Sequence, residues 1–233
     1  MTFRLNRTAL VTVAWAAVLF LSSAAAIGLL AVRVERTGSW QWSFLVFNLA
    51  LSWIPLAFAS VVALLIRLRA SKWTIVAPAL AWLVFLPNSP YIWTDLIHLS
   101  NHRREFFVTD FVLISSFALA GLLAGYASLY LTQDAIERSF GRAAGWLIVA
   151  GALPLTSVGI YIGRVLRWNS WQSFEKADEL LSLAAARAAH PLDSPRPVAA
   201  CLLMTLCLAA GYAVAFALTR VALTYPARRT SPR

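Results

Sequence analysis

The chain has 233 residues, of which 60% are hydrophobic and only 13% are charged. Soluble domains carry about 25% charged residues, so a soluble protein of this length cannot hide so much apolar surface, and its natural solvent is lipid. Basic residues outnumber acidic ones by 20 to 10. They lie at the ends of apolar runs, which indicates anchoring at membrane headgroups and argues against a nucleic-acid-binding protein.

Six apolar runs predict an all-α integral membrane protein, and we interpret residues 1–233 as a single transmembrane domain. The first run follows Arg4 and Arg7 and is too long for the core of a secretory signal, which favours an uncleaved anchor. The expected transmembrane helices cover residues 8–32, 43–66, 73–99, 107–131, 143–166 and 198–218.

The third expected span is irregular. Its apolar run from Trp73 to Leu86 has 14 residues, which is too short to cross a membrane comfortably at ~1.5 Å per residue. The segment Pro87–Pro90 interrupts it, and the apolar pattern then resumes as far as Leu99. Either a short span ends at Pro87 and an interfacial helix follows, or one broken helix crosses the membrane with its break inside.

The links that follow the fourth and fifth spans are polar. The first contains Asp134 and Glu137. The second shows apolar residues at three- and four-residue steps near 171–190, which predicts an amphipathic helix at the membrane surface. Slightly more basic residues fall on the side of the two termini, led by the cluster at 67–72, so the positive-inside rule predicts cytoplasmic termini.

This topology places the two densest polar and aromatic stretches on the same side of the membrane, the extracytoplasmic one. The first stretch covers residues 85–99, after the third apolar run, and the second covers residues 161–171, at the end of the fifth span. We expect them to form one site. Its expected ligand-binding residues are Asn88, Tyr91, Thr94, Asp110, Arg164, Arg167, Trp168 and Asn169.

Both stretches resemble motifs of a bacterial family of predicted membrane proteins, the domain of unknown function 1361 (DUF1361). Residues 86–98 read Leu-Pro-Asn-Ser-Pro-Tyr-Ile-Trp-Thr-Asp-Leu-Ile-His, and residues 161–171 read Tyr-Ile-Gly-Arg-Val-Leu-Arg-Trp-Asn-Ser-Trp. Asn48, with the following Trp53-Ile54-Pro55, and Asp110 also look like family positions, and the resemblance covers roughly residues 40–220. It implies a multi-pass protein of the bacterial inner membrane and carries no function, substrate or cofactor.

Asp95 and His98 are the candidate catalytic residues. They are three residues apart, so on a helix they share a face and can pair a carboxylate with an imidazole for acid–base or proton-handling work. If His102 joins them, the three side chains can bind a divalent metal, whose identity the sequence does not indicate. The plainer alternative is that His98 packs at the interface while Asp95 pairs with an arginine.

Arg164 and Arg167 are also three residues apart, at the end of the fifth span. Their guanidinium groups can clamp a phosphate or carboxylate, or neutralise Asp95 and Asp110 in a buried network, or simply reach the headgroups. Asn48 is a polar residue within the second span, where hydrogen bonding between helices is the usual role.

Three functions remain open on these residues. The first is a small transporter or permease-like protein for an anionic or proton-coupled solute. The second is a membrane-embedded enzyme that acts on a lipid-linked or anionic substrate. The third is a structural or assembly protein whose partners are membrane lipids and a second copy or another membrane protein. The chain lacks the Gly-rich phosphate loop and the His-Glu-x-x-His zinc motif, which argues against ATP-driven transport and zinc proteolysis.

Overall fold

The architecture was obtained from a computed structural model, which describes residues 7–101, 106–166 and 195–224. Six helices in these ranges are long and apolar enough to cross a membrane, and the same ranges contain no strand. A lipid solvent cannot hydrogen-bond the backbone, so a spanning segment must satisfy its own amide groups, as a helix does. The predicted all-α, multi-pass membrane fold is confirmed.

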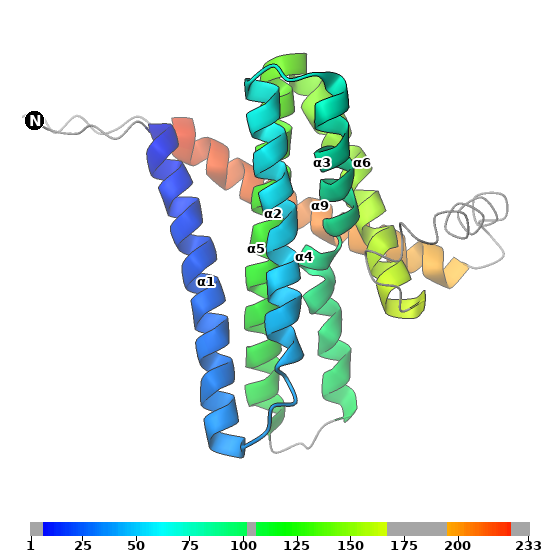
Figure 1. Cartoon of the computed structure of the whole chain (residues 1–233). Coiled ribbons are helices and arrows are strands. Elements are labelled where there is room, and N and C mark those ends of the chain that lie inside the picture. The colour runs from blue at the N-terminus through cyan, green and yellow to red at the C-terminus, as the bar shows by residue number, and fades with distance from the viewer. Residues whose placement is uncertain (1–6, 102–105, 167–194, 225–233) are drawn as a thin grey trace, which may run out of the picture.

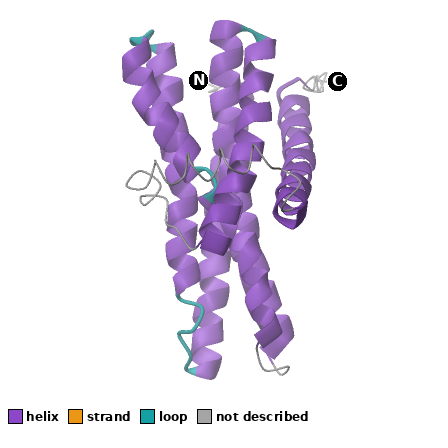
Figure 2. Ribbon diagram, turned by 90° about the vertical axis from the view of Figure 1, so that its right-hand side faces the viewer, coloured by secondary structure: helices purple, strands orange, loops and turns teal. Residues whose placement is uncertain are grey.

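The long helices match the apolar runs. They are α1 (Arg7–Thr37), α2 (Phe44–Arg67), α3 (Lys72–Phe85), α5 (Phe107–Phe140), α6 (Arg142–Tyr161) and α9 (Pro195–Thr224). Figure 2 shows that short loops join them, apart from the stretches that lie outside the described residues. The amphipathic helix expected near 171–190 falls in one of those stretches.

The centre of the fold is formed by α2 and α5, which pack along each other, while α1 stands to one side and α9 crosses the bundle obliquely (Figure 1). The most apolar stretch of α5 is 44% buried, whereas those of α1 and α9 are each 11% buried. The buried face of α5 carries small residues, among them Gly121, Ala124, Gly125 and Ser128. Small side chains let membrane helices approach closely, so the sequence of α5 suits it to the centre.

The third apolar segment is a discontinuous helix made of three pieces. After α3 come a short helix, α4 (Asn88–Tyr91), and a 3₁₀ helix, η1 (Ile92–Asn101), which continue in the same direction (Figure 1). Proline has no N–H to donate and clashes with the preceding turn, so Pro87 and Pro90 account for the break. Residues Lys72–Ile97 form one apolar segment long enough to span. The three pieces therefore form one broken helix, as the second alternative requires.

The break is packed inside the bundle. The Ser89 hydroxyl donates to the carbonyl oxygen of Ser52, near the middle of α2, at 3.0 Å. A Cβ atom placed on Gly121, near the middle of α5, would lie only 2.6 Å from the Ser89 carbonyl oxygen, and one on Gly159 of α6 would lie 2.4 Å from Pro87. Glycines on two neighbouring helices therefore make room for the interrupted backbone.

The central helix extends further than the apolar run that predicted it. The expected span ended at residue 131, and a polar link was expected to contain Asp134 and Glu137; instead, α5 continues to Phe140. The chain leaves it at Gly141, whose φ of 90° lies in the left-handed region that favours glycine. Asp134 and Glu137 therefore belong to the helix.

Candidate functional site

The carboxylate of Asp95 is the centre of a buried polar group formed by three helices. Asp95 lies on η1, and the residue is only 2% exposed. Its Oδ1 accepts a hydrogen bond from Arg164 Nη1 at 3.1 Å, and its Oδ2 accepts one from Asn48 Nδ2 at 3.2 Å. An amide from α2 and a guanidinium from the end of the fifth span thus hold one carboxylate, with which Arg164 forms an ion pair.

Arg164 is placed by a local irregularity of its own helix. After Tyr161, α6 widens into a π-helical turn, η3 (Ile162–Leu166). From this turn the Arg164 Nη2 atom donates to the carbonyl oxygen of Thr94 at 2.9 Å, and the guanidinium carbon lies 6.0 Å from the centre of the Tyr91 ring. Single π-helical turns occur frequently at functional sites, because they redirect a side chain without ending the helix.

The two partners of this ion pair differ in their exposure to the surroundings. The Asp95 side chain is 3% exposed, whereas that of Arg164 is 24% exposed. A carboxylate taken out of water is stable in its charged form only when it is paired and hydrogen-bonded, and Arg164 and Asn48 supply both requirements. The arrangement can therefore do two things chemically. A proton on Asp95 would weaken its hold on Arg164, and an incoming anion would compete with Asp95 for the guanidinium.

The structure brings together five of the residues singled out from the sequence: Asn48, Tyr91, Thr94, Asp95 and Arg164. Two of them use their backbone, since the carbonyl oxygens of Thr94 and Tyr91 accept hydrogen bonds from Arg164 and from the Thr94 hydroxyl, respectively. The pairing of Asp95 with an arginine is the alternative that these contacts show.

Other predicted members lie elsewhere. The Asn88 amide donates to the Phe85 carbonyl oxygen at 2.9 Å and so bridges the helix break. Arg167, Trp168, Asn169 and His102 lie outside the described residues. His98 belongs to η1, but its side chain is outside the described part as well. Within the ranges that the structure describes, no three His, Cys, Asp or Glu side chains gather as metal ligands would.

Asp110 belongs to a second buried ion pair, which it forms with Arg33 of α1. Arg33 near the end of α1 donates from Nε to Asp110 Oδ1 at 2.7 Å, and its guanidinium lies 4.6 Å from the Phe106 ring centre. The two side chains are 7% and 2% exposed. From the sequence, Arg33 reads as an ordinary basic residue flanking the first span. No local signal distinguishes such a residue from one that turns inward.

A third polar network, between α5 and α9, was also missed. The Tyr212 hydroxyl donates to Gln133, the Gln133 amide donates to Glu137 Oε1 at 2.7 Å, and Arg220 binds the other Glu137 oxygen. Gln133 is fully buried. A signal did exist, because Gln133 and Glu137 are one helical turn apart and Tyr212 and Arg220 also share a face of their helix. It was hidden by the prediction that the fourth span ended before them.

A family model described as "Protein of unknown function (DUF1361)" matches residues 47–210. That range includes Asn48, Asp95 and Arg164, whereas Arg33 and Arg220 lie outside it. No curated protein and no solved structure matches the chain. The match covers well over half of the sequence, as the resemblance of residues 86–98 and 161–171 had led us to expect. The chain therefore belongs to the DUF1361 family of multi-pass membrane proteins whose function is unknown.

Proposed function

We propose that this protein is a small transporter, of the permease kind, that moves an anionic or proton-coupled solute past the Asp95–Arg164 pair. The observation that carries the proposal is the buried Asp95 carboxylate, which Arg164 and Asn48 hold on a discontinuous membrane helix. Ionisable residues within membrane spans are costly and mark ion or substrate pathways by default. Discontinuous helices are the elements from which transporters build their binding sites.

The ion pair supplies a two-state element. In the closed state Arg164 is occupied by Asp95 and by the Thr94 carbonyl oxygen. A proton that binds Asp95 removes the negative charge and releases the guanidinium, which then binds the anion that travels with the proton. Because Arg164 is the more exposed partner, it is the one that meets the solute first. Loss of the proton on the other side restores the pair and expels the anion.

A flux assay tests the proposal. Full-length protein is reconstituted into phosphatidylcholine–phosphatidylglycerol vesicles that contain a pH-sensitive dye, and gradients of inorganic phosphate, acetate and succinate are applied in turn. We expect at least one anion to change the internal pH faster than in protein-free vesicles. Asp95→Asn and Arg164→Gln should each slow that change by about tenfold or more, because asparagine cannot take up and release the proton and glutamine loses a charge-assisted contact worth about 1.5–3 kcal/mol.

Two exposed charged residues provide matched controls. Glu35 near the end of α1 and Arg196 at the start of α9 are both exposed. The variants Glu35→Gln and Arg196→Gln remove the same charges as the test variants and should keep the wild-type flux. The proposal fails if no anion moves faster than in empty vesicles, or if Asp95→Asn and Arg164→Gln both transport at the wild-type rate.

The same proposal places the protein in a bacterial inner membrane with both termini in the cytoplasm, so that Asp95 lies toward the extracytoplasmic face. Support comes from the basic residues at the turn after α2, where Arg67, Arg69 and Lys72 are exposed. In a variant without Cys201 and Cys207, a membrane-impermeant maleimide added to spheroplasts should label Gln41→Cys but not Leu68→Cys. The opposite pattern would reverse the orientation.

A further inference from the structure

A cleft of about 920 Å³ lies between α1 and the α2–α5 pair, in the half of the bundle that contains the N-terminus of α1. It forms because α1 leans away from α2 and α5 toward its first residues (Figure 1). At the other end α1 is fastened to α5 by Arg33 and Asp110, and near its start Trp15 donates to Thr219 of α9 at 3.1 Å. The cleft is therefore braced open by contacts on both sides of it.

The walls of the cleft suit a hydrocarbon chain. The cleft is lined by small residues of the two central helices, among them Ala63, Ala127 and Ala135. Apolar residues of α1, such as Leu19, line its other side. The α2 residues that line the cleft run from Leu56 to Arg67, which is roughly 17 Å at ~1.5 Å per residue. One leaflet of the hydrocarbon core is about 15 Å thick, so the cleft is as deep as one leaflet.

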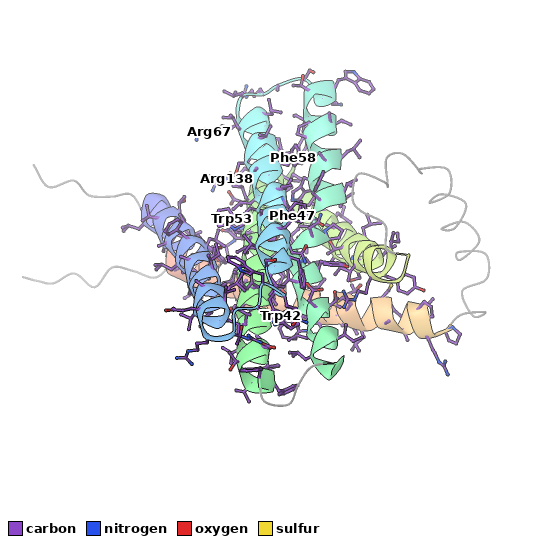
Figure 3. The ribbon with its side chains drawn as sticks, turned by 60° about the horizontal axis from the view of Figure 1, so that its bottom comes forward. Trp42, Phe47, Trp53, Phe58, Arg67 and Arg138 are labelled. Carbon is purple, nitrogen blue, oxygen red and sulfur yellow. The ribbon has the colours of Figure 1, made fainter. Side chains whose placement is uncertain are left out.

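The mouth of the cleft is basic. Arg67 and Arg138 line it, on the side of the central helices that faces α1 (Figure 3). Arg138 is bound by Asp134 at 2.8 Å, but Arg67 is exposed and has no ion pair within the described ranges. Arg69, Lys72 and Arg142 are exposed on the adjoining turns. Basic pockets between membrane helices bind the headgroups of anionic lipids.

One wall residue offers a hydrogen bond. Tyr130 lines the cleft, and its hydroxyl is buried without a hydrogen-bond partner in the part of the chain that the structure describes. An unsatisfied buried hydroxyl is unfavourable, so a ligand atom that accepted a hydrogen bond from it would be stabilising. The remaining walls are mainly apolar.

We infer that this cleft binds one anionic glycerophospholipid, with an acyl chain between α1 and the α2–α5 pair and its phosphate at Arg67. The depth of one leaflet, the apolar walls and the basic mouth together describe that molecule. A soluble anion would leave the apolar walls in contact with water, and a zwitterionic lipid would leave Arg67 with a partner of no net charge. The site is separate from the Asp95 group, so its test does not depend on the transport proposal.

Native mass spectrometry of the purified full-length protein in mild detergent tests the inference. Phosphatidylglycerol and phosphatidylcholine with identical acyl chains are titrated in parallel, and bound lipid is counted. The wild type should bind phosphatidylglycerol more tightly. Arg67→Gln should reduce that preference about fivefold, because one basic residue near the headgroup contributes about 1 kcal/mol. Ala63→Phe should remove the high-affinity binding of both lipids by filling the cleft.

Matched controls use the same substitutions outside the cleft. Ala57→Phe lies on the exposed surface of α2, and Arg196→Gln lies at the start of α9; both should bind lipid as the wild type does. Ser60→Phe, at an exposed position of the cleft wall, replaces Ala63→Phe if the latter does not fold, and it should show the same loss. Equal affinity of the wild type for the two lipids, or unchanged binding after the cleft is filled, would overturn the inference.

Discussion

Replacement of Arg33 by methionine is expected to lower the free energy of unfolding by about 3–5 kcal/mol, the cost of leaving one partner of a buried ion pair alone. Asp110 is 2% exposed, and it forms an ion pair with Arg33 at 2.7 Å. Without the guanidinium, the carboxylate must either bear a buried charge or take up a proton. Equilibrium unfolding in mixed micelles, followed by tryptophan fluorescence, measures the loss.

Removal of both charges should reverse most of that loss. In the double variant Arg33→Met with Asp110→Leu, no charge remains buried, and apolar side chains of similar volume fill the site. Replacement of a whole buried pair in this way is often neutral or stabilising. A single Arg33→Met variant that unfolds with the wild-type free energy would show that the pair contributes nothing. A double variant as unstable as the single one would show that the geometry of the pair matters beyond its charge.

A double substitution also distinguishes an effect on stability from an effect on transport at the Asp95–Arg164 pair. The double variant Asp95→Asn with Arg164→Gln should unfold at a free energy close to that of the wild type, because neither charge is left alone. Under the transport proposal it should nevertheless carry no proton-coupled flux. The double variant at Arg33 and Asp110, in contrast, should fold and keep its flux.

The second large effect is expected at Gly121. A Cβ atom there would lie 2.6 Å from the Ser89 carbonyl oxygen and 3.1 Å from the Ile92 side chain. Ser89 belongs to the helix break, and its hydroxyl is bonded to Ser52, so this backbone has little freedom to move away. Gly121→Ala should therefore destabilise the protein by about 1–3 kcal/mol through overpacking, despite the better helix propensity of alanine. The same unfolding assay measures it.

Gly151 is the matched control, because a Cβ atom there meets nothing within 4 Å. It lies within α6, so Gly151→Ala should stabilise the protein by about 0.5–1 kcal/mol through the conformational entropy of the unfolded chain. The two glycine-to-alanine substitutions should change the free energy of unfolding in opposite directions. Because the residue change is the same, the difference reports how tightly the helix break packs against α5. If Gly121→Ala is as stable as Gly151→Ala, the broken span does not pack against α5 as described.

The sequence by itself determined the membrane class, the six apolar helices and the position of the break at Pro87–Pro90. These features are local: the length of an apolar run is compared with the thickness of a bilayer, and a proline interrupts whichever helix contains it. The sequence also drew attention to residues 86–98 and 161–171, whose Asp95 and Arg164 the structure places 3.1 Å apart. Topology was enough to expect that approach, since both segments end on the same side.

Only the tertiary structure decided which charges meet. Asp110 pairs with Arg33 instead of Arg164, and Gln133 and Glu137 lie on a helix that continues beyond its apolar run. The cleft beside α1 is equally invisible in the sequence, because it depends on the angle at which two helices diverge. The partner of a polar side chain is set by the rotation, tilt and length of its helix relative to others. Those quantities come from the packing of residues far apart in the chain.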